Sequence, residues 1–334
     1  MKAAFFNNGV TFVPGDVIDF VYAQGRRQKV AELSHLHPSV ITSANFESQV
    51  GSLQDLEVIF SSWGMPALTP EQIAKLPSLK AVFYAAGSIK GFARPFLEKG
   101  IFVCSAWLAN AVPVAEFCVG QILLGMKGYF RNTRDYRNPE YVKKAYKGPG
   151  NYGDTVALIG MGGIGKKTLE LLAPYNLNKI IVSRYMPEEE AARLGVKKVT
   201  IEEAFAKGFV VSNHLADLES NKGVIDAKLL RSMRPGAVFI NTGRGAQVNE
   251  KDLVEVLRER SDLTALLDVT VTEPPVAGSA MYDLPNIQMT THIAGSNNDE
   301  VIRMADWMIE EYLRLQAGQP LHYAVSLQQL DTMA

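Results

Sequence analysis

Short apolar runs alternate with amphipathic stretches along the whole chain. The runs are rich in Val, Ile, Leu and Phe and are nearly continuous, which is typical of strands buried on both faces of a sheet. The stretches between them repeat apolar residues every three or four positions, as helices that bury one side do. This alternation predicts an α/β fold built on parallel sheets. The predicted strands are 2–7, 56–62, 80–86 and 101–106 in the first part of the chain, and 155–160, 179–184, 209–213, 237–241, 263–269 and 287–291 in the second.

The helices between these strands carry boundary signals of their own. Residues 69–76 begin with Thr69 as the expected N-cap, Pro70 at the first helical position and Glu71 in the first turn. The polar segment 136–154, which contains several Pro and Gly, is predicted to be a surface excursion between two doubly wound modules. Further helices are predicted over 112–130, 226–233, 249–260 and about 297–317.

Composition narrows the class of partner. Of the 334 residues, 47% are hydrophobic and 21% are charged, which suits about two globular domains. The 34 Lys and Arg against 35 Asp and Glu create no net field for nucleic acid or an anionic membrane, so a small-molecule partner is expected. No apolar run approaches the ~20 residues of a membrane span, and the N-terminal apolar patch is too brief for a signal peptide. The expected location is the cytoplasm.

The few potential metal ligands do not suggest a metal site. Cys104 and Cys118 lie in apolar surroundings without CxxC spacing, which favours buried thiols in a reducing compartment. His35 and His37 could pair on a metal ion. Their Pro-containing loop has no nearby acidic residues, so the metal interpretation is the weaker one.

A glycine-rich turn links the strand at 155–160 to a helix. Gly160, Gly162 and Gly165 form GxGxxG in "IGMGGIGKKT", with Gly163 and Ile164 at the helix start. The first glycine allows a tight turn, the second lets the backbone approach a pyrophosphate, and the third lets helix and strand pack closely. Free N–H groups at the helix start favour phosphate charge. This strand–turn–helix context predicts a dinucleotide site.

The next strand, "KIIVSRYMP", lacks the carboxylate that commonly holds the adenosine ribose of NAD(H). It ends in Ser183 and Arg184 instead. A guanidinium binds the 2′-phosphate of NADPH through charge-assisted hydrogen bonds, so NADP(H) is the expected cofactor and NAD(H) the alternative. The alternative carboxylates, at 188–190, follow Pro187 in a solvated helical context.

Three further strand ends carry polar residues that packing does not require. They are "INTGRGAQVN", "LLDVTVTEPP" and "TTHIAGSN", which contain Arg244, Glu273 and His292. The carboxyl ends of strands line the ligand crevice of an open α/β sheet. These three side chains are therefore expected to meet.

With these segments the chain resembles the D-isomer-specific 2-hydroxyacid dehydrogenase family. The resemblance covers nearly all of the second half, through "IGMGGIGKK", "RSMRPGAVFINTGRGAQVNEKDLVEVL", "ALLDVTVTEP" and "THIAGS", and the first half more loosely. It implies a flavodoxin-like substrate domain, from 1–112 and 299–334, and a Rossmann cofactor domain at 113–298. It also implies a homodimer formed through the cofactor domain.

By this resemblance Arg244 is the substrate-binding arginine, Glu273 its acidic partner and His292 the proton donor and acceptor. A planar guanidinium can hold both oxygens of a 2-oxo acid's carboxylate. An imidazolium can give a proton to the oxygen that becomes an alkoxide. A neighbouring carboxylate favours that imidazolium and fixes its orientation.

Other roles follow from the same resemblance. Asp268 is expected near the nicotinamide amide, although an Asp at a strand end can simply bond a turn. The chain departs from the family at Asp217, where Pro is usual. Thr242, Gly243 and His214 are expected to line the cofactor. Backbone N–H groups of Gly87 and Ser88 are expected to hold the substrate carboxylate, with Trp63 and Trp107 shaping the pocket or simply packing between domains.

Several functions remain open from the sequence. The favoured one is reduction of a small 2-oxo acid, of the glyoxylate or hydroxypyruvate type, to the D-2-hydroxy acid with NADPH. Formate oxidation would require an amide where Glu273 stands. An NAD-dependent phosphoglycerate-type dehydrogenase is a second alternative, disfavoured because a chain ending at Ala334 lacks the usual regulatory domain. A dinucleotide-sensing regulator on the same fold is a third.

Overall fold

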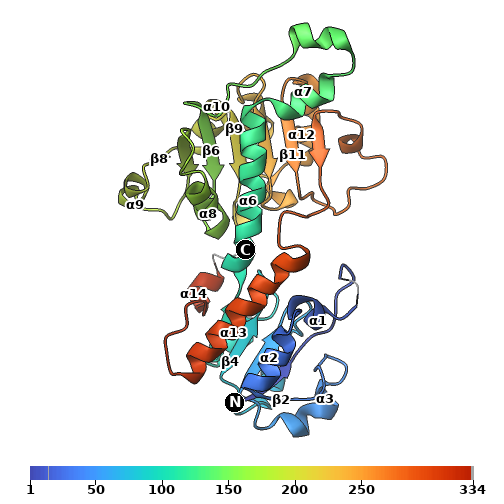
Figure 1. Cartoon of the computed structure of the whole chain (residues 1–334), viewed down its shortest axis with the longest axis vertical. Helices are drawn as coiled ribbons and strands as arrows, with labels where there is room; N and C mark the ends of the chain where they lie inside the picture. The colour runs from blue at the N-terminus through green and yellow to red at the C-terminus, as the bar shows by residue number, and fades with distance from the viewer. Residues whose placement is uncertain (14, 332–334) are drawn as a thin grey trace. The chain divides into compact units, whose positions relative to one another are not determined.

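The computed structural model describes residues 1–13 and 15–331 and divides into two compact units. Unit 1 comprises Met1–Asn110 together with the chain from Ser296 on, and unit 2 comprises Ala111–Gly295. The boundaries predicted from the sequence, at 112/113 and 298/299, fall close to these positions. Each unit contains one sheet in which every strand pair is parallel (Figure 1).

Unit 1 has a five-stranded sheet of flavodoxin-like order, β2-β1-β3-β4-β5. The four strands predicted for this part of the chain are confirmed, and β2 is an additional two-residue edge strand. This strand could not be predicted from the sequence, because it is only two residues long and one of them is an exposed histidine, so it contains no apolar run. The strands are β1 (Lys2–Phe5), β2 (His35–Leu36), β3 (Val58–Ser61), β4 (Ala81–Tyr84) and β5 (Phe102–Ser105).

Helices cover both faces of this sheet and form two apolar cores. The predicted cap of α4 is confirmed, because the side chain of Thr69 accepts from the Gln72 N–H and the side chain of Gln72 accepts from the Thr69 N–H. The late helix α13 returns to this sheet, and its Tyr312 ring lies 5.3 Å from that of Phe60. The helices are α1 (Val17–Val21), α2 (Arg26–Leu33), α3 (Phe46–Gln49), η1 (Val50–Leu53), α4 (Pro70–Ala74), α5 (Arg94–Glu98), η6 (Asn298–Val301), α13 (Ile302–Gln316) and α14 (Leu327–Leu330).

Unit 2 has a seven-stranded sheet of order β12-β11-β10-β9-β6-β7-β8. The chain runs outward from β6 and then returns to place β9 on the other side of β6. This change of direction is the topological switch point of a Rossmann fold, where ligands bind at the carboxyl ends of the strands. The predicted doubly wound fold is thus confirmed. The strands are β6 (Thr155–Ile159), β7 (Asn178–Val182), β8 (Lys197–Lys198), β9 (Val210–Asn213), β10 (Val238–Asn241), β11 (Thr264–Leu267) and β12 (Ile287–Met289).

Helices flank both faces of the unit 2 sheet, and two apolar clusters lie between the layers (Figure 1). Four of the helices described in this unit are short 3-10 helices, of which η3 and η4 connect a strand end to the next helix. The helices are α6 (Trp107–Met126), α7 (Tyr129–Asp135), η2 (Pro139–Lys144), α8 (Gly163–Leu171), α9 (Glu188–Arg193), α10 (Ile201–Lys207), η3 (Glu219–Asn221), α11 (Ala227–Arg231), η4 (Gly245–Gln247), α12 (Glu250–Glu259) and η5 (Ala280–Tyr282).

The long helix α6 differs from its predicted span, 112–130. It begins earlier, at Trp107, and ends at Met126 because Gly128 adopts a left-handed φ of 73°. Among the described residues it is the one helix that is long and apolar enough to cross a membrane. The expectation that no apolar run approaches this length was therefore wrong. Half of its most apolar window is buried in the fold, and Gly125 lies against Val210 and Val238 of the sheet.

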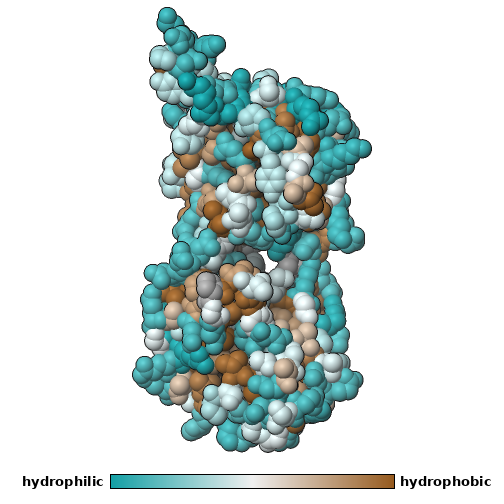
Figure 2. Space-filling model, turned by 90° about the vertical axis from the view of Figure 1, so that its right-hand side faces the viewer, coloured by the Kyte–Doolittle hydropathy of each residue, from teal (hydrophilic) through white to brown (hydrophobic). Residues whose placement is uncertain are grey.

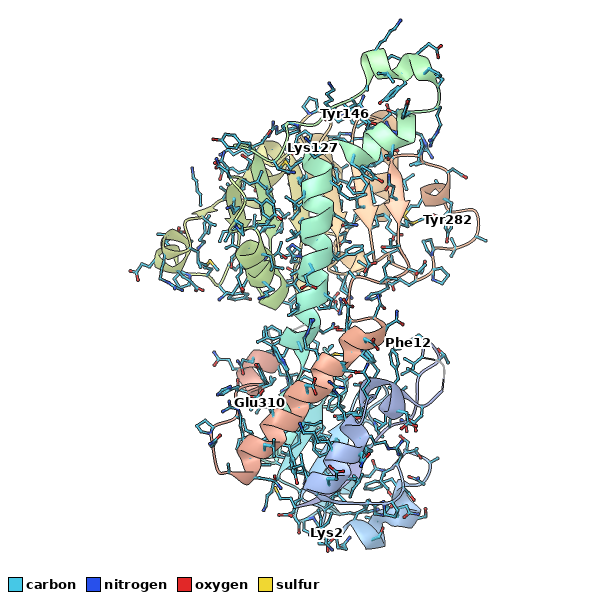
Figure 3. All side chains as sticks on the ribbon, in the orientation of Figure 1. Lys2, Phe12, Lys127, Tyr146, Tyr282 and Glu310 are labelled. Carbon is cyan, nitrogen blue, oxygen red and sulfur yellow. The ribbon has the colours of Figure 1, made fainter. Side chains whose placement is uncertain are left out.

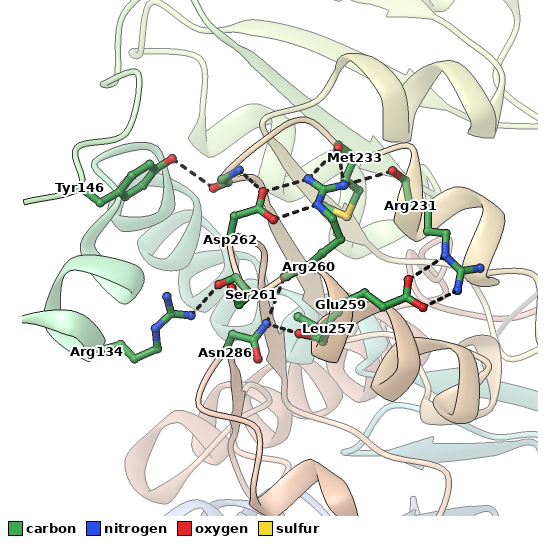
Figure 4. Close-up of polar contacts among 11 residues, drawn as sticks. Arg134, Tyr146, Arg231, Met233, Leu257, Glu259, Arg260, Ser261, Asp262 and Asn286 are labelled. Carbon is green, nitrogen blue, oxygen red and sulfur yellow. Dashed lines mark hydrogen bonds and ion pairs between the residues drawn. The ribbon is translucent and has the colours of Figure 1, made fainter.

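The segment that follows α6 is anchored at the amino ends of the strands. Tyr146, which lies near Lys127 at the end of α6 (Figure 3), donates its hydroxyl hydrogen to the Gly236 carbonyl at 3.3 Å. Asp262 accepts from the Gly236 N–H at 2.9 Å and from Arg260 at 2.8 and 2.9 Å (Figure 4). Hydrogen bonding to Arg260 lowers the pKa of Asp262 to about 2. This network holds the base of the segment, whose tip around η2 projects with a largely hydrophilic surface (Figure 2).

Candidate active site

The glycine turn lies at the switch point between β6 and β9. A Cβ at Gly160, whose φ is 92°, would meet the carbonyl oxygen of His214 at 2.6 Å, and a Cβ at Gly165 would collide with the Gly160 carbonyl. Gly162, the N-cap of α8, has nothing within 4 Å of a built Cβ. The outer two glycines thus satisfy packing, while the middle one faces open space beside the free N–H groups of Gly163 and Ile164. Such a cradle fits the pyrophosphate of a dinucleotide.

Ser183 and Arg184 follow directly on β7, at the same edge of the sheet. The Gly160 N–H donates to the Val182 carbonyl at 2.9 Å, so this strand end lies beside the glycine turn. Ser183 Oγ accepts from the Met186 N–H at 3.1 Å, and the Arg184 side chain is exposed.

The acidic residues that could replace the missing ribose carboxylate lie on α9. Two of them have basic partners of their own: Glu190 pairs with Lys166 at 2.9 Å and Glu188 with Lys198 at 3.1 Å. Either glutamate would have to leave its lysine partner before it could bind the ribose of a cofactor. Arg184 therefore remains the charged side chain next to the strand end.

His214 follows β9 and is buried. Neither ring nitrogen has a hydrogen-bond partner among the described residues, and burial lowers the pKa of this histidine to about 4. Buried polar groups are nearly always hydrogen-bonded. The backbone of His214 lies against Gly160, so its orphaned imidazole is compatible with the role beside a bound cofactor that the sequence predicts for this residue.

The loop after β10 carries Arg244. Thr242 Oγ1 lies 3.3 Å from the Cys118 thiol, and a Cβ at Gly243 would meet Gln247 Oε1 at 2.5 Å, so a larger residue at this position would displace the Gln247 amide. Arg244 Nη1 donates to its neighbour's carbonyl at 2.7 Å, and Arg244 Nε lies 3.8 Å from Asp217 Oδ2. The structure therefore pairs Arg244 with Asp217, a contact that the sequence does not predict.

His292 and Glu273 form a direct pair. The distance between His292 Nδ1 and Glu273 Oε2 is 2.7 Å, and the two side chains are 51% and 39% exposed. An imidazole that donates from Nδ1 to a carboxylate keeps a fixed ring orientation and leaves Nε2 for a ligand. Arg244, Glu273 and His292 follow three neighbouring strands, β10, β11 and β12, at their carboxyl ends.

Asp268 holds the turn that carries His292. Its carboxylate accepts from Thr290 Oγ1 at 2.6 Å and from the N–H groups of Ile293 at 2.8 Å and Ala294 at 3.0 Å, while its carbonyl accepts from the His292 N–H. His292 has a left-handed φ of 59°, which costs a non-glycine residue on the order of 1–2 kcal/mol. Asp268 thus stabilises this strained turn, which is the simpler of the two roles the sequence left open.

The substrate-loop candidates belong to unit 1. Trp63 follows β3, its carbonyl accepts from Asn7 Nδ2 at 2.7 Å, and its ring lies edge-on to Phe12 at 5.7 Å. Gly87 follows β4, and its carbonyl accepts from Ser105 Oγ at 2.6 Å. Ser88 is exposed and Trp107 is the first residue of α6. Sequence reasoning missed Phe12, which no local pattern distinguishes from a core aromatic.

The remaining histidine and cysteine candidates have ordinary surroundings. The ring nitrogens of His37 lie 3.1 Å from the Ser39 carbonyl and 3.1 Å from Ser52 Oγ. Cys104 and Cys118 are buried and unpaired. Within 1–13 and 15–331, no group of three or more His, Cys, Asp or Glu side chains is placed to hold a metal ion.

Known proteins resemble this chain in sequence. A D-3-phosphoglycerate dehydrogenase of Methanocaldococcus jannaschii is 27% identical over 277 residues, which cover 82% of this chain and 52% of that protein. An (S)-sulfolactate dehydrogenase of Chromohalobacter salexigens is 28% identical over 250 residues, 74% of this chain and 81% of that one. The chain spans about half the length of the phosphoglycerate dehydrogenases that it matches.

Solved structures share the fold. A phosphoglycerate oxidoreductase from Rhizobium etli superimposes with a TM-score of 0.77 at 18% identity, covering 97% of both chains. The Rhodotorula graminis D-mandelate dehydrogenase gives a TM-score of 0.76 at 18% identity, with the same coverage. Finally, residues 119–294, more than half of the chain, match the model of the NAD-binding domain of the D-isomer specific 2-hydroxyacid dehydrogenases. The chain belongs to the D-isomer specific 2-hydroxyacid dehydrogenase family.

Proposed function

We propose that this protein reduces a 2-oxo acid to the D-2-hydroxy acid, and runs the oxidation in reverse, with a nicotinamide dinucleotide. The observation that carries this proposal is the 2.7 Å pair between His292 and Glu273, next to the strand that presents Arg244. A regulator that only senses a dinucleotide needs none of these three side chains, so the complete set favours turnover.

In the proposed mechanism Arg244 binds the carboxylate of the 2-oxo acid through its planar guanidinium. His292 donates a proton from Nε2 to the ketone oxygen, where negative charge develops. Glu273 holds Nδ1 and stabilises the protonated ring before the transfer. Gly160, Gly162, Gly165 and the start of α8 would hold the dinucleotide, which supplies the hydride when bound.

The finer proposals concern substrate and cofactor. We assign a small 2-oxo acid of the glyoxylate or hydroxypyruvate type, and NADPH in preference to NADH, because Arg184 is exposed at the end of β7 while Glu188 and Glu190 have partners of their own. An NAD-dependent phosphoglycerate-type dehydrogenase is the second candidate, favoured by the name of the Methanocaldococcus jannaschii relative.

We also propose a cytoplasmic homodimer that associates through unit 2. Support comes from large apolar side chains that are exposed on and beside the segment after α6: Leu124, Tyr129, Tyr136, Val142 and Tyr152. Apolar side chains exposed along one segment suit contact with a second copy of the chain. The buried, unpaired cysteines suit a reducing compartment.

The test is a panel of 2-oxo acids assayed with NADPH and with NADH. The panel contains glyoxylate, hydroxypyruvate, pyruvate and 3-phosphohydroxypyruvate. Oxidation of the reduced cofactor with one or more of these acids is the expected result, with D configuration of the product for every acid except glyoxylate, whose product is achiral. Tight cofactor binding without turnover of any acid would favour the sensing role instead.

Arg184→Asp should reverse or abolish the preference for NADPH. The wild type is expected to favour NADPH by one to two decades in kcat/KM, or about 1–3 kcal/mol, which is typical of charged hydrogen bonds. An aspartate would repel the 2′-phosphate and could accept from the ribose hydroxyls of NADH. The matched control is Arg193→Asp, the same charge change at an exposed position on α9. A wild type that prefers NADH, or a ratio that Arg184→Asp leaves unmoved, contradicts this assignment.

A further inference from the structure

Asp217 lies beside the proposed substrate arginine but has no part in the mechanism above. Its Oδ2 is 3.8 Å from Arg244 Nε, and the two side chains are 47% and 38% exposed. Both are therefore within reach of solvent and of a small ligand. A carboxylate of the protein thus faces the same guanidinium that would bind the carboxylate of a substrate.

A buried amide fixes this arrangement. Gln247 is 1% exposed, and its Oε1 accepts from Asn213 Nδ2 at 2.7 Å and from the Arg244 N–H at 3.1 Å. Its Nε2 donates to the carbonyls of Leu215 and Ala216 at 2.9 and 3.0 Å. All four hydrogen-bonding positions of the amide are used, so it has no spare position for another partner.

The two loops are therefore tied together on either side of the ion pair. The Arg244 backbone N–H is bonded to the oxygen of the Gln247 amide. The carbonyls of Leu215 and Ala216, immediately before Asp217, are bonded to its nitrogen. Asn221, which follows Asp217 in the sequence, also donates from Nδ2 to the Ala216 carbonyl, at 2.8 Å. Moving the loop of Asp217 away from Arg244 would break partly buried hydrogen bonds, which costs more than rotating an exposed side chain.

We propose that Asp217 is a specificity-determining residue that makes the site selective for monoanionic 2-oxo acids over acids with a second anionic group, such as a phosphate or sulfonate. This inference rests on the proposed function, because it assumes that Arg244 binds the substrate carboxylate. The proposed preference for monoanionic acids would distinguish this chain from two relatives whose names give a phosphorylated and a sulfonated acid as substrate.

The physical reason is the balance of charge around one guanidinium. Arg244 already faces the carboxylate of Asp217, which also lies near the Lys222 ammonium, so a substrate carboxylate adds a second negative charge next to Arg244. When the carboxylate of a three-carbon acid is bound at Arg244, a second anionic group on that acid stays within about 8 Å of Asp217, which is the Debye length at physiological salt. The Asp217 carboxylate therefore repels this second group as well. Because both side chains are partly exposed, this repulsion is partly screened, and a three- to tenfold effect is expected rather than exclusion.

The experiment compares pyruvate with 3-sulfopyruvate and 3-phosphohydroxypyruvate in the wild type and in Asp217→Asn, each with its preferred reduced cofactor. We expect the wild type to favour pyruvate. The substitution should raise kcat/KM for the two acids that carry a second anionic group three- to tenfold more than for pyruvate, chiefly through a lower KM, with the difference shrinking at high salt. Glu219→Gln is the matched control, because it removes a charge from the same loop at a side chain that pairs with Lys222 instead of Arg244.

The outcomes separate the two proposals. If the wild type reduces 2-oxo acids but Asp217→Asn leaves unchanged the ratio of kcat/KM between the acids with a second anionic group and pyruvate, the charge-selection role is wrong and the proposed function stands. If the wild type reduces none of them, the proposed function fails. Calorimetry then measures the dissociation constants of pyruvate and 3-sulfopyruvate for the wild type and for Asp217→Asn. An equal ratio of the two constants in both proteins again refutes the role of Asp217.

Discussion

Replacing His292 by alanine is expected to lower the turnover of 2-oxo acid reduction by about two to four decades, the range usual for loss of a general acid. The reason is the pair between His292 Nδ1 and Glu273 Oε2, which orients the ring and leaves Nε2 as the proton donor. Binding of the dinucleotide should change little, because the glycine turn that would hold it follows a different strand, β6.

The measurement is kcat under saturating cofactor, together with the dissociation constant of the reduced cofactor. His35→Ala, at an exposed histidine of the edge strand β2, serves as the matched control. Near-normal turnover in a correctly folded His292→Ala protein would remove this residue from the mechanism. Glu273→Gln keeps a hydrogen-bond acceptor but removes the charge, so a change in the pH profile of kcat/KM tests the carboxylate separately.

A second large effect is expected on stability in acid, through His214. Burial lowers the pKa of this histidine to about 4 in the folded chain, against about 6.5 for the unperturbed side chain. Above pH 6.5 the ring is neutral in both states and makes no pH-dependent contribution. As the pH falls from 6.5 to 4, the unfolded chain binds a proton that the folded chain does not, so the free energy of unfolding decreases by up to about 3 kcal/mol.

The test compares urea unfolding at pH 7.5 and pH 5 in the wild type and in His214→Gln, which keeps a polar side chain without a titrating ring. The variant should lose less stability between the two pH values than the wild type. His35→Gln, at an exposed position, should behave as the wild type does. An equal loss in wild type and His214→Gln would show that His214 does not stay neutral in the folded chain. Saturating dinucleotide can be added in a parallel series, since a ligand that satisfies the orphaned ring nitrogens should change the acid dependence.

The strand and helix pattern could be predicted because each element carries its own local signal. The apolar run 237–241 is a strand buried on both faces, and Thr69 caps a helix by bonding a residue three positions away. Signals failed where an element is too short to show a pattern, as with β2 and β8, or where its end depends on a remote contact. Helix α6 ends at Met126, just before the left-handed Gly128, where the carbonyls of Met126 and Lys127 accept from the N–H groups of Gly150 and Gly148.

The catalytic candidates could also be found from sequence, because parallel strands in one sheet bring their carboxyl ends to one edge. Arg244, Glu273 and His292 each follow a recognisable apolar run, so their common edge follows from the topology. The pairing of His292 with Glu273 was also expected. The contacts that hold the surrounding loops did not follow from the sequence. Asp268 lies 22 residues from the Thr290 hydroxyl that it binds, and Gln247 lies 34 residues from Asn213.

The amino-acid sequence by itself determined the α/β class, the positions of most strands, the glycine turn and the residue types that suit a dehydrogenase of 2-hydroxy acids. These properties depend on neighbours within a few residues, or on strand order. Only the tertiary structure decided that Asp268 holds the turn of His292, that the buried His214 ring has no hydrogen-bond partner within the described part of the chain, and that Arg244 shares its charge with Asp217. Each of these depends on which loops meet in space, because burial and hydrogen bonding act between side chains that are distant along the chain.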